Sequence, residues 1–367
     1  MLNSRKSKLA QILVEHSTRI EPGDRVIIEA TTAAEPLIRA LYRSILEHGG
    51  HPHLLMKIPE QEKELFTFGN EKQLAQVNEF QKHAYEQFEA RIRIHSLTNT
   101  HALDSFSSPK QSQRQKAKAS ILSTQMDRGA KGVFKWVTTL YPTKAYAQEA
   151  GMSLNKYEEF VYRACHADQE EPTAFWNQVR EKQAQAKHIF QGQDQIQLSG
   201  ANIDLTLSVN GRTFINSYGI HNMPDGEIFT GPVEDSVNGW VRFSYPAIYN
   251  GVMVRGIELT FKEGKVVQAS AEEKEDFLIE MLDSDAGSRY LGEFAFGMNS
   301  EIQRFTGNIL FDEKIGGTVH MALGAGYPQT GSKNKSMIHW DMICDMRKDS
   351  EIKVDGDLVY QDGKFLF

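Results

Sequence analysis

The sequence predicts two domains of different class: an α/β domain with a parallel sheet, followed by a mainly antiparallel α+β domain. In the first half, short apolar strands alternate with amphipathic helices, which is the pattern of βαβ units and parallel sheets. In the second half, segments that alternate apolar and polar residues follow one another with turns between them, which is typical of antiparallel sheets. The length of 367 residues also favours two domains. We place the boundary between residues 1–190 and 191–367.

The first half repeats the strand–helix theme. Gly49 and Gly50 end a helix whose apolar stripe includes Leu37 and Leu41, and a strand follows directly. There is no GxGxxG motif or P-loop, so the fold alone predicts no nucleotide. A charged helix that begins near Pro172 links the two halves. The predicted strands cover residues 25–30, 53–58, 91–95 and 133–137, and the predicted helices cover 5–17, 34–48, 71–88 and 110–128, with further helix to about 190.

The second half changes to period-two alternation after residue 194. The pair Asn210-Gly211 predicts a tight hairpin after the second strand, and Glu263-Gly264 predicts a second turn. The predicted strands cover residues 195–199, 203–209, 239–245, 252–261 and 265–271, and a helix is predicted over 272–284.

The composition excludes several classes of function. The net charge is −7, and there is no run of basic residues, which argues against a general nucleic-acid binder. No apolar run approaches the roughly 20 residues that a membrane span needs. Cys165 and Cys344 form no paired motif, so the sequence predicts no disulfide framework. The N-terminal residues lack the apolar core of a signal peptide, and we expect a cytoplasmic protein without membrane or nucleic-acid partners.

The segment around His339 and Asp341 is the first candidate for chemistry. Side chains two residues apart in a strand point to the same face, so this strand should present an imidazole and a carboxylate side by side. His320 lies in a second short strand, followed by Gly324 and Gly326, which we expect to leave open space around it. Two histidines and an aspartate form a mixed N/O ligand set that suits Zn, Co or Mn. The second domain is therefore predicted to bind metal.

Two further carboxylates occur in apolar surroundings. Glu227 follows a turn and opens an apolar strand, and Glu293 interrupts an apolar run. Buried carboxylates need a partner, and a divalent metal is a suitable one. Each residue alone has a plainer explanation: Glu227 as a surface strand end, Glu293 as half of an ion pair, and His320 as a hydrogen-bonded core histidine. Glu313 is a further candidate, although its neighbour Lys314 also fits a surface ion pair.

Four ordered motifs together resemble one known family. They are Gly-Glu-Ile-Phe-Thr at 226–230, Leu-Gly-Glu-Phe-Ala-Phe-Gly at 291–297, Gly-Gly-Thr-Val-His-Met-Ala-Leu-Gly-Ala-Gly-Tyr-Pro at 316–328 and Ile-His-Trp-Asp-Met at 338–342. This series resembles the thermophilic-type metalloaminopeptidases, the family of aminopeptidases T and S. The resemblance covers most of the chain and is strongest over residues 219–347.

The resemblance implies a function and a set of site residues. It implies a metal-dependent aminopeptidase of broad specificity, with two divalent ions and a peptide substrate that has a free N-terminus. Glu293 would bridge the ions or handle a proton, and Tyr327 would bind metal or stabilise the oxyanion. It also implies a homodimer, for which apolar side chains near Phe294, Phe296 and Trp340 could form a surface, although they equally fit a core. The metal-site positions that it implies are Glu227, Glu293, His320, Tyr327, His339 and Asp341.

Two other functions compete with this one. The chain could be a non-catalytic metal-binding protein whose α/β domain binds a small ligand, or a sugar or nucleotide enzyme built on the α/β half. The first is less favoured because structural zinc sites usually consist of Cys and His tetrads, which the sequence lacks. The second rests on the βαβ pattern alone.

Overall fold

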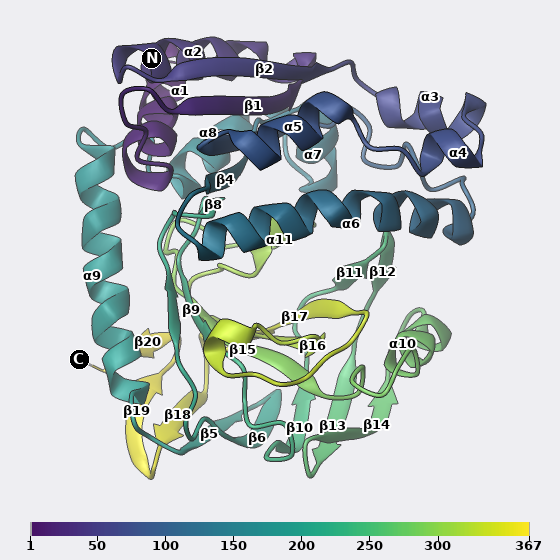
Figure 1. The fold of residues 1–367 in the computed structure, drawn as a ribbon. Helices are drawn as coiled ribbons and strands as arrows, with labels where there is room; N and C mark the ends of the chain where they lie inside the picture. Colours follow the sequence, from purple (N-terminus) through teal and green to yellow (C-terminus); the bar gives the residue numbers. More distant parts are fainter. Residues whose placement is uncertain (1, 367) are drawn as a thin grey trace. The chain divides into compact units, whose positions relative to one another are not determined.

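The chain folds into two compact units in a computed structural model that describes residues 2–366 (Figure 1). The first unit takes the chain up to Trp176, together with Gly219–Pro224, and the second takes the remainder. The boundary between the units therefore falls within the long helix α9 (Pro172–Phe190). The prediction that an α/β domain ends at residue 190 and a metal-binding domain begins at residue 191 stays a prediction.

The first unit is built on a parallel sheet of five strands, as the βαβ pattern predicts. Its order is β2-β1-β3-β4-β8, and every pairing in it is parallel. Val26, Ile28 and Ile92 are buried on these strands, which explains their β-branched composition. The last strand comes from a later part of the chain. The strands are β1 (Arg25–Thr31), β2 (His51–Lys57), β3 (Ala90–His95), β4 (Lys135–Leu140) and β8 (Asn222–Met223).

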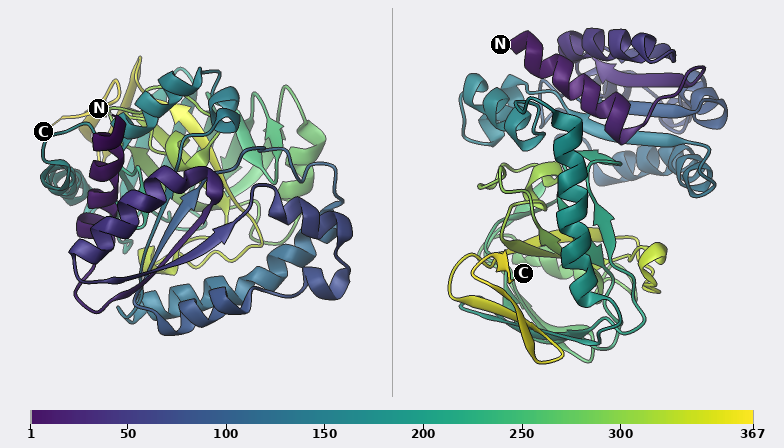
Figure 2. Two further views of the ribbon diagram at one scale, coloured as in Figure 1. Left: turned by 90° about the horizontal axis from the view of Figure 1, so that it is seen from above. Right: turned by 90° about the vertical axis from the view of Figure 1, so that its left-hand side faces the viewer.

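Helices flank this sheet, and α1 and α2 lie side by side (Figures 1 and 2). α2 has proline in its first turn and buries Leu37, Leu41 and Ile45. The flanking helices are α1 (Leu2–Gln11), followed by the π-helical turn Ile12–Ser17, then α2 (Glu35–Glu47), α3 (Gln61–Phe68), α4 (Glu71–Leu74), α5 (Glu79–Gln87), α6 (Ser108–Ala130), α7 (Lys144–Glu149) and α8 (Leu154–Ala164).

The single helix predicted over residues 71–88 is wrong. The segment forms two helices, α4 and α5, because Asn78 interrupts it as an N-cap. Asn70 precedes the segment and forms a capping box with Gln73, and the side chain of Asn78 accepts a hydrogen bond from the backbone of Gln81. The cap at Asn78 starts a new helix where periodicity alone indicated one continuous element.

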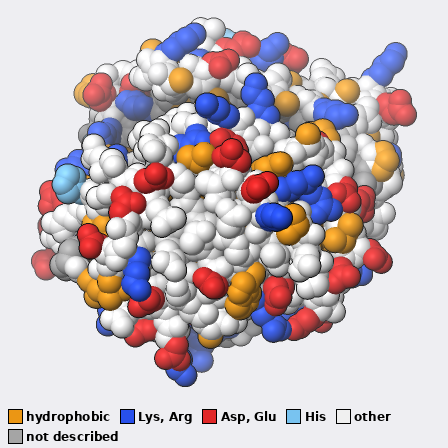
Figure 3. Space-filling model, turned by 90° about the horizontal axis from the view of Figure 1, so that it is seen from below, with side chains coloured by type: hydrophobic (Ala, Val, Ile, Leu, Met, Phe, Trp, Pro, Cys, Tyr) orange, Lys and Arg blue, Asp and Glu red, His pale blue; other side chains and the backbone are white. Residues whose placement is uncertain are grey.

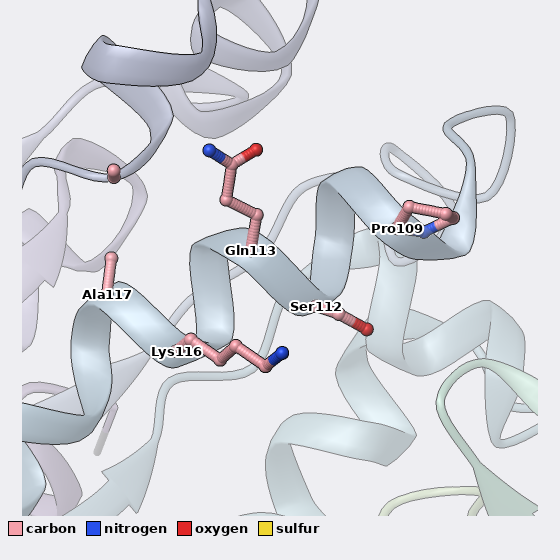
Figure 4. A pocket seen from close by; sticks show the side chains of 6 residues that line it. Pro109, Ser112, Gln113, Lys116 and Ala117 are labelled. Carbon is pink, nitrogen blue, oxygen red and sulfur yellow. The ribbon is translucent and has the colours of Figure 1, made fainter.

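A shallow pocket lies on α6 in the first unit (Figure 4). Its lining includes Lys116, but every charged or polar group there is exposed or half-buried. The pocket therefore lacks the buried polar groups that orient a ligand. The lining residues are Ala75, Pro109, Ser112, Gln113, Lys116 and Ala117.

The second unit consists of antiparallel sheets, as the alternation predicts. An eight-stranded sheet has the order β14-β13-β10-β6-β5-β18-β19-β20, and a five-stranded sheet has the order β17-β16-β15-β9-β7. The first contains β5 (Gln195–Gly200), β6 (Ile203–Ser208), β10 (Asn238–Arg242), β13 (Glu258–Lys262), β14 (Lys265–Ser270), β18 (Ser350–Val354), β19 (Asp357–Gln361) and β20 (Lys364–Phe365). The second contains β7 (Ile215–Ser217), β9 (Glu227–Thr230), β15 (Leu291–Gly297), β16 (Thr318–Gly324) and β17 (His339–Asp345).

Three smaller elements complete this unit, and two local predictions fail in it. The strands β11 (Ala247–Tyr249) and β12 (Val252–Val254) form a separate pair, and α10 (Glu275–Leu282) precedes β15. Asn210-Gly211 does not join paired strands, because β6 pairs with β5 and β10 whereas β7 belongs to the other sheet. The strand predicted over 252–261 is divided at Gly256, whose φ of +63° takes the chain out of the extended conformation.

One apolar core fills the second unit between its sheets. Phe294, Phe296 and Trp340 are at most 1% exposed and pack in this core, so these side chains do not form the dimer surface considered above. They point away from the polar face of the five-stranded sheet. The face drawn in Figure 3 mixes acidic and basic side chains without a large patch of one sign. Among the described residues, no helix is long and apolar enough to cross a membrane.

Candidate metal centre

The five-stranded sheet gathers the predicted site residues on one face. β15, β16 and β17 are adjacent and antiparallel, with Glu293 opposite Ala322 and Ala322 opposite Asp341. Because alternate residues share a face, His320 and His339 lie on this side, and Trp340 lies on the core side. The small Ala322 thus separates two carboxylates contributed by different strands.

The side chains of this face approach one another closely. Nε2 of His339 lies 3.2 Å from Glu293 Oε2 and 3.6 Å from Asp341 Oδ1. Nε2 of His320 lies 3.7 Å from Glu293 Oε1 and 3.6 Å from Glu227 Oε2. Glu293 therefore lies between the two imidazoles, and each of its oxygens faces one of them. Five of the six predicted site residues form one cluster.

A backbone contact fixes the orientation of His339. Its Nδ1 lies 2.8 Å from the carbonyl oxygen of Ala325, and it can only donate to that acceptor. Nε2 is then the nitrogen with a free lone pair, and it faces Glu293 and Asp341. A ligand histidine is commonly held by such a hydrogen bond from its second nitrogen.

Glu313 joins the cluster from outside the sheet. It follows the short helix α11 (Ile309–Asp312). Its carboxylate, the imidazole of His320 and the carboxylate of Asp341 form a group whose potential ligand atoms are within 4.8 Å of one another. Glu293, His339 and Asp341 form a second group by the same measure. Asp341 belongs to both groups, so the candidate ligands form two overlapping sets.

Lys314 is a site residue that sequence reasoning missed. Its side chain is fully buried, its Nζ contacts Glu313 Oε1, and it lies 3.6 Å from Glu227 Oε1. The surface ion pair considered for Glu313 and Lys314 is therefore wrong. The sequence pattern of residues 311–315 gave no sign of this burial, because the segment folds as an irregular turn after α11. The Asp-Glu-Lys run next to an apolar segment was the available signal.

Several buried polar atoms of the cluster lack hydrogen-bond partners among the described residues. They are Glu227 Oε2, His320 Nδ1 and Asp341 Oδ1. Buried polar atoms are nearly always satisfied, and a lone pair without a donor is costly. A cluster of two imidazoles and four carboxylates, three of which carry an unsatisfied atom, fits divalent ions that accept N and O ligands. The residues present therefore fit the metal that the ligand pattern predicts.

Two carboxylates of the cluster have pKa values shifted in opposite directions. Burial raises the pKa of Glu227 well above its ordinary value, although Lys314 opposes this. Burial also acts on Glu293, but hydrogen bonds from His320 and His339 outweigh it and hold the Glu293 pKa at about 2. Glu293 thus remains an anion between the imidazoles.

The charged neighbours act on the histidines and on Asp341 in turn. Burial lowers the pKa of His339, but Asp341 and Glu293 overcome this and raise it to about 10. Likewise Glu293 and Glu227 raise the pKa of His320 to about 9 against the effect of burial. Burial raises the pKa of Asp341 to about 6. The carboxylates around each imidazole therefore favour a positive charge at that place, which is the electrostatic requirement for a cation site.

Tyr327 lies at the edge of the cluster. Its ring centroid is 5.2 Å from that of His339 and 5.4 Å from that of Phe229, and its side chain reaches solvent. Burial of the ring and the nearby carboxylates Glu293 and Asp341 raise the pKa of its phenol. The phenol therefore keeps its proton and can donate a hydrogen bond. Its predicted role as a metal ligand stays a prediction.

The glycines near His320 do not leave open space, so that expectation is wrong. Gly324 has a φ of +98°, and a Cβ built on it would lie 2.2 Å from the carbonyl oxygen of Ile338. A Cβ on Gly326 would lie 1.9 Å from Ser332 Oγ. These glycines instead allow the segment that carries Tyr327 to pass close to β17.

Comparisons with known proteins find relatives along nearly the whole chain. Aminopeptidase 2 of Geobacillus stearothermophilus is 27% identical over 398 residues, covering 97% of this chain and 94% of that one. The solved structure of wild-type AmpT from Thermus thermophilus shares the fold, with a TM-score of 0.86, 23% identity and full coverage of both chains. A 2,5-dihydroxypyridine dioxygenase from Pseudomonas putida KT2440 also resembles it, with a TM-score of 0.63, 14% identity and coverage of 99% and 97%. The fold alone therefore does not determine the reaction.

The family assignment rests on the sequence as a whole. The family model described as thermophilic metalloprotease (M29) matches residues 2–365, which is nearly the entire chain. That match includes both units and all the candidate ligands. This chain therefore belongs to the M29 family of thermophilic metalloproteases, whose members are peptide-bond hydrolases.

Proposed function

We propose that this protein is a metal-dependent aminopeptidase that removes N-terminal residues from peptides with broad specificity. The observation that carries the proposal is the buried cluster of two imidazoles and four carboxylates, with lone pairs that no described residue satisfies. Membership of the metalloprotease family and the names of relatives such as aminopeptidase 2 support it.

We propose two divalent ions, with Zn, Co or Mn as the candidates. The two overlapping ligand groups support this number, because each contains one histidine and two carboxylates and they share Asp341. His339 would serve one ion and His320 the other, with Glu293 between them. Glu227 and Glu313 would each use the oxygen that Lys314 does not contact. Tyr327 completes the set of proposed site residues.

When bound, divalent ions at this site supply an acidified water, a polarised scissile carbonyl and an anchor for a free N-terminal amine. Glu293 is the proposed proton carrier, because it stays ionised in a buried position between two imidazoles. The phenol of Tyr327 keeps its proton and is placed beside His339, so it can donate to the oxygen on which negative charge develops.

The proposal extends to the substrate and the assembly. A peptide with a free N-terminus is the expected substrate, and a blocked peptide should not be cut. We also propose a homodimer, as the family resemblance implies, and a cytoplasmic location. Light scattering should then give about twice 41.5 kDa. A fully active monomer at every concentration would contradict the dimer.

Metal dependence and end specificity test the enzyme directly. Exhaustive chelation should abolish hydrolysis of a free peptide, and Co, Zn or Mn should restore at least part of it. Mass spectrometry should show loss of the first residue from the free peptide and no change in its N-acetylated form. Full activity with no metal left, or internal cleavage of the blocked peptide, would overturn the proposal.

The alternative is a non-catalytic metal-binding protein. Under that alternative the protein would bind metal with the same residues and would hydrolyse no aminoacyl-arylamide. Metal content by elemental analysis, measured on the same sample as arylamide hydrolysis, separates the two. The phenol of Tyr327 favours the enzyme, because a site that only binds metal has no use for a proton donor beside an imidazole.

A further inference from the structure

A group of basic side chains lies in the first unit, away from the metal centre in the sequence. Its members are linked by electrostatic influence or direct ion pairs, and they comprise five cations and two carboxylates. An excess of positive charge is notable in a chain whose net charge is −7. The cations are Lys57, Arg91, Arg93, Arg114 and Lys118, and the carboxylates are Glu29 and Glu62.

The parallel sheet places Lys57 and His95, with Arg93 two residues before the strand end, where α/β folds bind ligands. From β1 the chain moves to β2 on one side of it in the sheet, and then returns to β3 on the other side. The direction in which strands are added therefore changes between β1 and β3. Ligands of open α/β sheets bind outside the carboxyl ends of strands at such a point. Arg91, Arg93 and His95 are alternate residues of β3 and share one face, and Lys57 and His95 are the last residues of β2 and β3.

Part of this positive charge is neutralised within the protein. Arg93 Nε lies 3.0 Å from Glu29 Oε2, and Gln81 also donates to Glu29. Glu62 forms two ion pairs, with its Oε1 lying 2.5 Å from Lys118 Nζ and 3.1 Å from Arg114 Nε. Each carboxylate of the group is thus already engaged.

Arg91 and Lys57 are not neutralised in this way. Arg91 is 1% exposed, and its guanidinium contacts Thr138 Oγ1 at 3.3 Å with no carboxylate within 4.0 Å among the described residues. Its Nε has no hydrogen-bond partner in that part of the chain. Lys57, at the end of β2, likewise has no ion pair with any described side chain. Buried or clustered cations without counter-ions are costly, and an anion that binds between them removes that cost.

We propose that the first unit binds a small oxyanion, a carboxylate or a phosphoryl group, at the carboxyl ends of β1 and β3, beside the end of β2. Lys57 and the Arg93 guanidinium would contact the anion, and Arg91 would support it from beneath through its charge. His95 would be the neutral hydrogen-bonding group at the rim, since it is exposed to water at the end of a central strand. This site is independent of the proposed peptidase chemistry.

The surroundings of His95 agree with a site for an anion. Protein atoms around the ring and, to a smaller extent, the positive charges of Arg93 and Arg91 lower the pKa of His95 to about 4, although part of the side chain reaches water. The positive charges of Arg93 and Arg91, which contribute to this shift, also attract an anion. An ammonium and a guanidinium suit carboxylate and phosphoryl oxygens, which accept charge-assisted hydrogen bonds.

The test uses the full-length, metal-loaded chain and variants at Lys57. Lys57 is the residue to change because it is half-buried and makes no ion pair, so its replacement should leave the fold intact. Titration calorimetry with inorganic phosphate, at constant ionic strength, compares wild type with Lys57→Gln, Lys57→Arg and Arg39→Gln. Arg39 is an exposed α2 residue paired with Glu35, and its change removes the same charge elsewhere in the unit.

We expect phosphate to bind wild type and Lys57→Arg, and Lys57→Gln to weaken that binding by about tenfold, the value of one charge-assisted hydrogen bond. Arg39→Gln should bind as wild type does. Any phosphate held at the metal centre is common to all four proteins, so the difference between them reports on the first unit. No binding by wild type, or equal affinities for Lys57→Gln and Arg39→Gln, would overturn the proposal.

A second titration identifies the source of the oxyanion. An N-acetylated dipeptide offers a terminal carboxylate, and its C-terminal amide lacks it. Binding of the acid but not of the amide, with loss in Lys57→Gln, would identify a peptide carboxylate. Binding of phosphate without binding of the acid would identify a phosphoryl ligand. Neither titration measures hydrolysis, so its outcome is separate from the test of the aminopeptidase.

Discussion

Nε2 of His339 lies 3.2 Å from Oε2 of Glu293, and the two residues come from strands that are not adjacent. β16 lies between them, with Ala322 opposite Glu293 and Gly324 opposite His339. The contact therefore crosses a strand that carries small residues at both of these positions.

Replacing the ligands of β17 should separate metal binding from stability. His339→Ala and Asp341→Asn should each remove metal and activity, because the remaining ligands no longer complete the site. Trp340→Ala should leave the ligand face in place and cost roughly 3–5 kcal/mol of stability, because Trp340 packs in the core. Bound metal and thermal midpoint are measured on each variant. Retention of two metals and near-normal turnover in the first two variants would disprove the assignment.

Lys314→Met should lower the thermal midpoint sharply. The substitution keeps the apolar stem but leaves Glu227 and Glu313 without their buried cation, and breaking a buried pair costs about 3–5 kcal/mol. Added divalent metal should raise the midpoint of this variant more than that of wild type, because it replaces the lost positive charge. Lys335→Met, at an exposed position, is the control. An unchanged midpoint in Lys314→Met would show that the ammonium does not balance these carboxylates.

Gly324→Ala should disturb the metal centre as well as the fold. Gly324 pairs with His339 and has a φ of +98°, and its added Cβ would lie 2.2 Å from the Ile338 carbonyl oxygen. Gly356→Ala is the matched control, since Gly356 has a φ of +95° with no atom within 4 Å of its Cβ. Backbone strain alone costs about 1–2 kcal/mol in both. Metal affinity should fall in Gly324→Ala and stay normal in Gly356→Ala; equal metal affinity would refute the coupling.

The stability of the first unit should depend on pH through Glu29. Burial raises the Glu29 pKa, but the charges of Arg93 and Arg91 and hydrogen bonds outweigh it, so the folded pKa is lower than the unfolded one. Its contribution is therefore fully present above the unfolded value of about 4.3, and it is lost as the pH falls through the folded value. The difference in denaturation midpoint between wild type and Glu29→Gln should shrink below about pH 4.5. Glu47→Gln, at an exposed helix position, should show no such trend.

The sequence predicted the elements that depend on local pattern. Strand–helix alternation predicted the parallel sheet, and the His-x-Asp spacing predicted that His339 and Asp341 share a face, because strand side chains alternate whatever the partner strand. The ordered motifs predicted the family. The helix boundary at Asn78 was missed because capping depends on side-chain hydrogen bonds that periodicity does not contain.

Tertiary structure alone decided which distant residues meet. Glu293 reaches both histidines because β15, β16 and β17 pair in one register, and that register is set by burial of Phe294, Met321 and Trp340 against the other sheet. Lys314 lies beneath Glu227 because the turn after α11 is packed inside, although its sequence reads as a surface ion pair. Alternation is a property of one strand, whereas register and burial depend on the free energy of packing the whole core. No local sequence pattern contains that free energy.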